Sequence, residues 1–185
     1  MSNKPKIAVD VDGVLADVYS PIFQMIGLPY TWEDVKKWDF FDELGVDRQN
    51  FWKTYKKLWS EKFHVIPLIE KDSPKILAEL RRSFEIHIMP SRPKGTRLGT
   101  LQWLEYHRIG YDKIIFLPPS ADKTKMLSLD NYLCLVDDNP AFVKDERVIL
   151  FDQPWNQGVF ARRIRSLKEL FDILPAIESP PQRGV

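Results

Sequence analysis

The sequence predicts an α/β protein built on a doubly wound, mainly parallel, Rossmann-like sheet. Short apolar runs typical of buried strands occur at residues 7–11, 85–89, 113–117, 131–136 and 148–151. Most of these runs are separated by segments with helical spacing, and strands that alternate with helices favour a parallel sheet. The stretch after the first strand interrupts this alternation and predicts a small helical insertion at residues 18–70.

The helices between the strands have recognisable signals. Residues 73–74 are Ser-Pro, a pair typical of a helix start, and residues 76–84 carry apolar side chains at helical spacing. Further helices are expected at residues 98–104, 122–125 and 162–174.

The insertion is crowded with aromatic side chains. Thr31 and Asp47 are suited to cap helices, and the apolar residues of 51–59 recur at helical spacing, so we expect two to four short helices here. Most of the aromatic residues must form the core of this module, since it has few other apolar side chains.

Two carboxylates follow the first strand directly. Asp10 and Asp12 end the apolar run, and Gly13 allows a sharp turn. Alternation along a strand points both side chains the same way, and ligands of open parallel sheets bind at the carboxyl ends of the strands. Two adjacent like charges favour a divalent cation such as Mg²⁺. The alternative is a turn in which Asp and Gly merely suit the loop.

Charged or polar segments also follow the other strands. They read Pro-Ser-Arg-Pro at residues 90–93, Asp-Lys-Thr at residues 122–124 and Asp-Asp-Asn-Pro at residues 137–140. The alternative for residues 137–140 is a turn with a helix cap, which explains one of the two acids but does not readily explain both. A lone Lys123 at a helix start is usually solvated, and Ser91 could simply cap the next helix.

In this order, the segments resemble the motifs of the haloacid dehalogenase superfamily, in which Asp-x-Asp-Gly follows the first strand. The run Asp-Val-Asp-Gly-Val-Leu-Ala-Asp at residues 10–17 looks most like the 5′(3′)-deoxyribonucleotidase branch, as does the segment at residues 149–156. The resemblance implies a core of residues 1–17 and 71–175, a helical cap of residues 18–70 over the active site, and a loose tail of residues 176–185.

The resemblance also implies chemical roles. Asp10 would be the nucleophile of phosphoryl transfer, Asp12 the general acid and base, and Lys123 the cation that offsets the gathering negative charge. Mg²⁺ would be held by Asp10, by Asp138 as a direct ligand and by the backbone carbonyl of Asp12. Asp137 would contribute through a bridging water or by supporting the direct ligands.

The phosphate-binding motif departs from the family pattern. The usual Thr is replaced by Pro90, which has neither a hydroxyl nor an N–H. Ser91 and Arg92 are carried over as phosphate ligands, with Lys94 as additional charge. The alternative for Arg92 is a solvated side chain.

The implied function is a Mg²⁺-dependent phosphomonoesterase that hydrolyses (deoxy)nucleoside monophosphates through an aspartyl-phosphate. Phe40, Phe41 and Trp59 are the aromatic residues expected to stack on the base. One alternative is a phosphatase of another small phosphoester, such as a sugar phosphate. The other is a nucleotide-binding domain with weak turnover, because Pro90 replaces the Thr.

Composition narrows the class of partner. The 185 residues carry a formal net charge of +1, and the sequence has no basic stripe. Neither feature favours a nucleic acid polymer or a membrane as partner. The single cysteine, Cys134, lies in an apolar run and predicts a buried thiol in a cytoplasmic protein. His87 is expected to be structural. A homodimer stays open.

Overall fold

The computed structural model describes residues 4–178, apart from the side chains of Ala176 and Glu178. A six-stranded sheet has the order β3-β2-β1-β4-β5-β6, and every pair of neighbouring strands is parallel. The strands are β1 (Lys6–Val9), β2 (Glu85–Ile88), β3 (Lys113–Ile114), β4 (Tyr132–Asp137), β5 (Val148–Phe151) and β6 (Arg163–Ile164). The prediction of a doubly wound parallel α/β fold is confirmed.

The two central strands bring distant parts of the chain together. β1 and β4 are almost entirely apolar and buried, so both faces of the sheet must be covered here. Val9 is in register with Val136, and the Asp10 N–H donates to the Val136 carbonyl at 3.0 Å. The residues that follow β1 and β4 therefore meet at one edge of the sheet.

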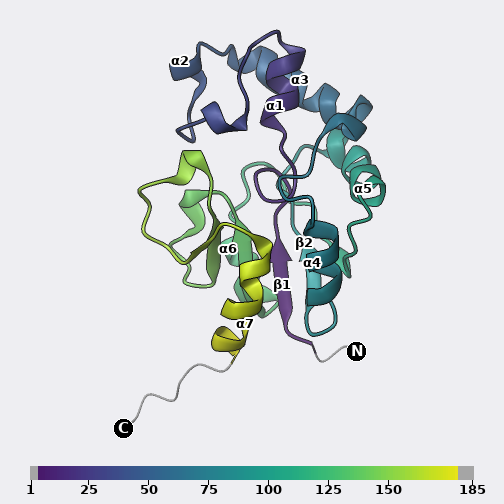
Figure 1. Cartoon of the computed structure of the whole chain (residues 1–185), viewed down its shortest axis with the longest axis vertical. Helices are drawn as coiled ribbons and strands as arrows, with labels where there is room; N and C mark the ends of the chain where they lie inside the picture. Colours follow the sequence, from purple (N-terminus) through teal and green to yellow (C-terminus); the bar gives the residue numbers. More distant parts are fainter. Residues whose placement is uncertain (1–3, 179–185) are drawn as a thin grey trace.

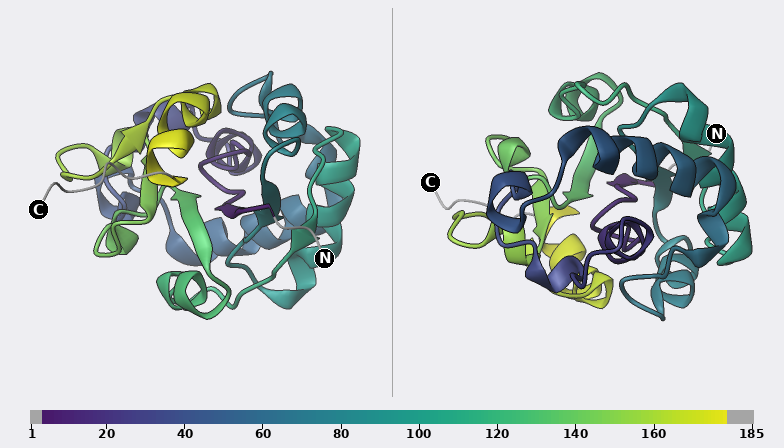
Figure 2. Two further views of the ribbon diagram at one scale, coloured as in Figure 1. Left: turned by 90° about the horizontal axis from the view of Figure 1, so that it is seen from below. Right: turned by 90° about the horizontal axis from the view of Figure 1, so that it is seen from above.

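Helices cover the sheet on both faces. They are α4 (Ser73–Leu80), α5 (Arg97–Tyr106), α6 (Thr124–Leu129) and α7 (Leu170–Glu178). In Figure 1, α4 and α7 lie in front of the sheet and α6 behind it, and the view from below separates the same two layers (Figure 2, left). None of the helices in residues 4–178 combines the length and apolar character needed to cross a bilayer.

The predicted closing helix begins later than expected. Residues 162–166 were assigned to a helix, but Arg163–Ile164 form β6, with hydrogen bonds from the Leu150 N–H to the Arg162 carbonyl and from the Asp152 N–H to the Ile164 carbonyl. The helical region starts after Ser166, whose capping box with Glu169 fixes its first turn. α7 extends to Glu178, and the rest of the predicted tail, residues 179–185, lies outside the described residues.

The insertion lies above the carboxyl ends of the strands (Figure 1). It contains α1 (Tyr19–Met25), α2 (Phe41–Leu44), α3 (Arg48–Glu61) and the 3₁₀ helices Trp32–Asp34 and Phe63–Val65. The Asp47 side chain caps α3 as expected, whereas Thr31 begins only a 3₁₀ turn. The chain leaves and re-enters the core side by side, since the Asp17 N–H donates to the Pro67 carbonyl at 3.0 Å.

Helix α3 is packed tightly against the core helix α5. A Cβ built on Gly99 of α5 would lie 1.5 Å from the backbone carbonyl oxygen of Trp59 in α3, so only glycine permits this approach. The Trp59 and Trp103 rings meet edge to face at 5.8 Å. Seen from above, α3 crosses over the strand ends (Figure 2, right). This contact sets the position of every side chain that α3 directs toward the strands.

Two residues outside the site are buried in the sheet. His87 lies between the Tyr132 hydroxyl, 2.6 Å from its Nδ1, and Glu85, 2.8 Å from its Nε2, which is a structural arrangement. Cys134 is fully buried in β4, and burial raises the pKa of its thiol to about 12.

Candidate active site

Three carboxylates gather where β1 and β4 end. Asp10 follows β1, Asp137 is the last residue of β4 and Asp138 follows it. One oxygen from each lies within 4.8 Å of the others, and all three residues are buried. The parallel register of β1 and β4 produces this cluster from residues far apart in the sequence.

Lys123 lies inside the cluster. Its Nζ is 2.8 Å from Oδ2 of Asp10 and 2.7 Å from Oδ2 of Asp137, and its side chain is only 2 % exposed. Burial by itself would lower the pKa of Lys123, but Asp10 and Asp137 raise it above its ordinary value. Lys123 is therefore a fixed positive charge beside Asp10.

One lysine does not balance three buried carboxylates. Burial raises the pKa of Asp137 to about 6, although Lys123 acts in the opposite direction. Burial, together with Asp137 and Asp10, raises the pKa of Asp138 well above its ordinary value. A compact set of carboxylate oxygens with excess negative charge suits a hard divalent cation such as Mg²⁺. The Asp12 carboxylate does not belong to this set.

The loop after β5 holds Asp138 in place. The Trp155 indole N–H donates to Oδ2 of Asp138 at 2.9 Å, and the Asn156 side-chain amide donates to the Asp138 carbonyl at 2.9 Å. The Gln153 amide donates to the Gly13 carbonyl at 2.7 Å, which ties the same loop to the turn after β1. Residues 149–156 stand out in the sequence only for their resemblance, so this direct support of Asp138 was not foreseen.

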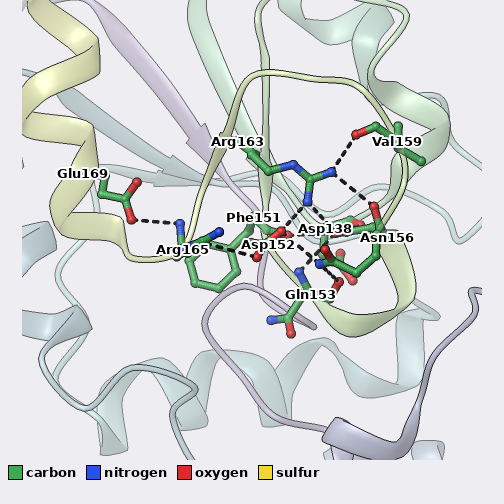
Figure 3. Close-up of polar contacts among 10 residues, drawn as sticks. Asp138, Phe151, Asp152, Gln153, Asn156, Val159, Arg163, Arg165 and Glu169 are labelled. Carbon is green, nitrogen blue, oxygen red and sulfur yellow. Dashed lines mark hydrogen bonds and ion pairs between the residues drawn. The ribbon is translucent and has the colours of Figure 1, made fainter.

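Arg163 of β6 fastens this loop from the outside. Its guanidinium donates to the Asp152 carboxylate, to the Asn156 carbonyl at 3.3 Å and to the Val159 carbonyl at 2.7 Å (Figure 3). The strand that sequence analysis missed therefore stabilises the loop that supports Asp138.

Asp12 is held between two donors. Nη2 of Arg92 lies 2.9 Å from Oδ1 of Asp12, and the Tyr55 hydroxyl lies 2.6 Å from Oδ2. Burial raises the pKa of Asp12, while Arg92 acts in the opposite direction. An acid with a raised pKa is suited to give up a proton during catalysis.

Arg92 is buried behind Asp12 and outside the cavity lining. Its guanidinium is fully buried, lies 4.1 Å from the centre of the Trp59 ring and donates to the Thr100 hydroxyl as well as to Asp12. It is not among the residues that line the cavity, so its position does not support a phosphate contact, and it is not solvated either. Lys94 is exposed and also lies outside the lining.

Ser91 is placed differently. It lines the cavity, and its buried hydroxyl oxygen has no hydrogen-bond partner among the described residues. A buried hydroxyl without a partner is unfavourable unless a ligand completes its hydrogen bonds. The Pro90 carbonyl accepts from the Leu117 N–H at 3.0 Å, so Pro90 serves the extension of the sheet toward the site.

The acids open into a cavity of about 430 Å³ between the insertion and the strand ends. Its core side includes Asp10, Asp12, Ser91, Lys123, Asp137 and Asp138. Its other side comes from the insertion, with Tyr19, Trp38, Phe51, Trp52, Tyr55 and Lys56.

The three aromatic residues expected to stack on a base are not part of this lining. Phe40 and Phe41 are buried and stack on each other at 4.4 Å, and Trp59 lies beneath Arg92. Phe40 and Phe41 pack inside the insertion, which needs them as its core, whereas Trp59 packs against Trp103 of α5. The aromatic lining from α3 is instead Phe51, Trp52 and Tyr55, and the spacing of Trp52 and Tyr55, one turn apart, was a usable signal.

Comparison with known proteins identifies the fold. No protein-family model matches the chain, and no curated protein matches it. A haloacid dehalogenase (HAD) superfamily hydrolase of subfamily IA from Geobacter sulfurreducens aligns with a TM-score of 0.55 and 12% identity, over 94% of this chain and 100% of that one.

Two further solved structures carry bound ions. A HAD family hydrolase from Deinococcus radiodurans with bound phosphate and sodium aligns with a TM-score of 0.54 and 15% identity, over 96% of this chain and 98% of that one. A candidate HAD hydrolase from Bacillus subtilis bound to magnesium aligns with a TM-score of 0.57 and 14% identity, over 94% and 99%. The chain therefore has the Rossmann-like fold of haloacid dehalogenase superfamily hydrolases.

Proposed function

We propose that this protein is a Mg²⁺-dependent phosphomonoesterase. The observation that carries the proposal is the position of Asp10, which is buried beside Lys123 and at the same time faces the cavity. A carboxylate held next to a fixed cation and within reach of a small ligand is suited to nucleophilic catalysis. The unpartnered hydroxyl of Ser91 on the same cavity provides a contact for a phosphate oxygen.

The reaction divides into two steps. A carboxylate oxygen of Asp10 bonds to phosphorus while the ester P–O bond breaks, and Asp12 gives a proton to the departing oxygen. Asp12 then takes a proton from a water molecule, which attacks phosphorus and releases phosphate from Asp10. Lys123 offsets the negative charge that gathers on Asp10 and on the phosphoryl oxygens.

The metal would be held by the acidic cluster. Asp10 and Asp138 are suited to direct ligation. The resemblance adds the Asp12 backbone carbonyl as a further ligand. Asp137 supports them, because its two oxygens are already engaged by Lys123 and by the Asn139 N–H. Bound Mg²⁺ supplies positive charge to the phosphoryl oxygens during transfer.

A (deoxy)nucleoside monophosphate is the substrate that best suits the insertion side of the cavity. Trp38 and Trp52 are 48% and 51% exposed although they line it, so a ring surface is open to a planar group. Stacking a base on such a side chain contributes about 1–3 kcal/mol. Lys56 adds one cation to the same wall.

A sugar phosphate is the second candidate. Trp52 already packs edge to face against Phe51 at 5.3 Å and near-perpendicular to Tyr55 at 5.5 Å. These contacts already cover part of the Trp52 ring without a base, so this side of the cavity also suits a substrate with a smaller leaving group.

The test is release of inorganic phosphate from a panel of nucleoside monophosphates and sugar phosphates, with and without Mg²⁺. We expect Mg²⁺-dependent release with preference for nucleotides, and loss of turnover in Asp10→Asn with the fold intact. Asp72→Asn, which changes an exposed carboxylate paired with Lys75, serves as the matched control. Activity that survives in Asp10→Asn would reject the assigned nucleophile, and indifference to the base would favour the sugar phosphate.

A further inference from the structure

One contact between the insertion and the core is made at the Asp12 carboxylate. Tyr55 extends from α3 and places its hydroxyl 2.6 Å from Oδ2 of Asp12, while Arg92 from the core holds Oδ1 at 2.9 Å. Tyr55 is only 5% exposed, yet it also lines the cavity. Tyr55 and the proposed general acid Asp12 thus line the same cavity and are hydrogen-bonded to each other.

One face of α3 carries both supports of Asp12. Tyr55 and Trp59 are four residues apart and therefore lie on the same side of the helix. Tyr55 contacts Asp12 directly, and Trp59 lies beneath the Arg92 guanidinium at 4.1 Å. The close approach at Gly99 fixes α3 to α5, so both of these α3 side chains are held by a contact between two helices.

The two oxygens of Asp12 are not equivalent. Arg92 has donors and no acceptor, so Oδ1 can only accept from it. A tyrosine hydroxyl can both donate and accept, so Oδ2 is the oxygen that can carry a proton in this setting. Oδ2 is also the oxygen bonded to Tyr55, and both Tyr55 and Asp12 line the cavity.

We propose that Tyr55 is a positioning residue that aims Oδ2 of Asp12 at the leaving oxygen of the substrate. The inference rests on the proposed phosphomonoesterase function and adds a residue to it. The proton moves from Oδ2 to the leaving oxygen as the P–O bond breaks and its electron pair passes to that oxygen. The Tyr55 hydroxyl then turns to donate to Oδ2 and stabilises the carboxylate left behind.

The test uses leaving groups that differ in their need for a proton. A nucleoside monophosphate releases an alkoxide and requires the acid, whereas p-nitrophenyl phosphate releases a stable phenolate and does not. In Tyr55→Phe, which keeps the ring, we expect kcat/KM on the nucleotide to fall on the order of tenfold or more, with KM little changed. We expect kcat/KM on p-nitrophenyl phosphate to change by less than about threefold.

Tyr132→Phe is the matched control. It also removes a buried hydroxyl with a 2.6 Å hydrogen bond, here to His87, at the opposite end of β4 from the acids. We expect kcat/KM on both substrates to stay at the wild-type value. The Mg²⁺ affinity of Tyr55→Phe should also match the wild type, because Tyr55 does not belong to the acidic cluster.

An equal loss on both substrates, or no loss on either, would overturn the inference and leave the phosphomonoesterase standing. If Tyr55→Phe does not fold, Arg92→Lys replaces it, and we expect the same selective loss because lysine is shorter and lacks the planar fork that engages Asp12 and Thr100 together. The proposed function fails separately, when the wild-type protein releases no phosphate or Asp10→Asn retains turnover.

Discussion

Gly13 leaves no space for a side chain in front of Asp138. A Cβ at Gly13 would lie 2.3 Å from Oδ2 of Asp138 and 3.1 Å from the Trp155 ring. Gly13 also has a φ of +78°, a conformation that other residues rarely adopt. The glycine of the first motif therefore makes the turn after β1 and admits the Asp138 carboxylate beside it.

Gly13→Ala should displace Asp138 and lower Mg²⁺-dependent phosphate release by about tenfold or more, because a catalytic group moved by an ångström loses much of its effect. Gly45→Ala is the control, since Gly45 has a φ of +64° and no described atom within 4 Å of an added Cβ. We expect Gly45→Ala to reduce the free energy of unfolding by about 1–2 kcal/mol and to keep full activity. Full activity in Gly13→Ala would contradict the proposed role of Asp138.

Mg²⁺ should stabilise the protein against heat by relieving repulsion among Asp10, Asp137 and Asp138. At a hundredfold excess over its dissociation constant, a ligand of the native state contributes about 2.7 kcal/mol. The measurement is the melting temperature with Mg²⁺ and with a chelator. If the melting temperature is the same with Mg²⁺ and with a chelator, the proposed metal site is contradicted.

Asp138→Asn tests whether the stabilisation by Mg²⁺ depends on the Asp138 carboxylate. Removing one charge from the cluster should raise the melting temperature in chelator and abolish the response to Mg²⁺. The exposed Asp72→Asn should leave the response unchanged. If Asp138→Asn still responds like the wild type, the metal does not depend on Asp138.

Local sequence was enough to predict where the acids meet. Parallel strands align their carboxyl ends, so apolar runs that end in Asp10 and in Asp137 and Asp138 predict a shared edge once both are read as neighbouring strands. The structure brings these residues and Lys123 together, while their chemical roles stay predictions.

The remaining features depend on tertiary contacts that no local pattern contains. The direction of Arg92 is set by the Trp59 ring, by Thr100 and by Asp12, and its position in the motif contains none of these contacts. Which aromatic residues face the cavity depends on how α3 is rotated against α5. The strand β6 forms because the edge of β5 needs a partner, which overrides the helical pattern of its residues.

Trp52 should contribute to recognition of a nucleobase. We expect Trp52→Ala to raise KM for nucleoside monophosphates by about tenfold, the lower range of a stacking contact, and to leave KM for ribose 5-phosphate unchanged. The control is Tyr106→Ala, an exposed aromatic residue of α5 outside the cavity lining. An equal effect on both classes of substrate would argue for the sugar phosphate instead.

Gly99→Ala tests whether the packing of α3 on α5 holds the site together. The added Cβ would meet the Trp59 carbonyl at 1.5 Å, and both groups belong to helices, so the helices must separate. We expect the free energy of unfolding to fall by about 3 kcal/mol, as for overpacking of a close contact, and nucleotide hydrolysis to fall as Tyr55 moves away from Asp12. Gly95→Ala, where no described atom lies within 4 Å of the new Cβ, should change neither. Urea unfolding and phosphate release measure the two effects, and wild-type values of both in Gly99→Ala would show that Tyr55 is positioned by other contacts.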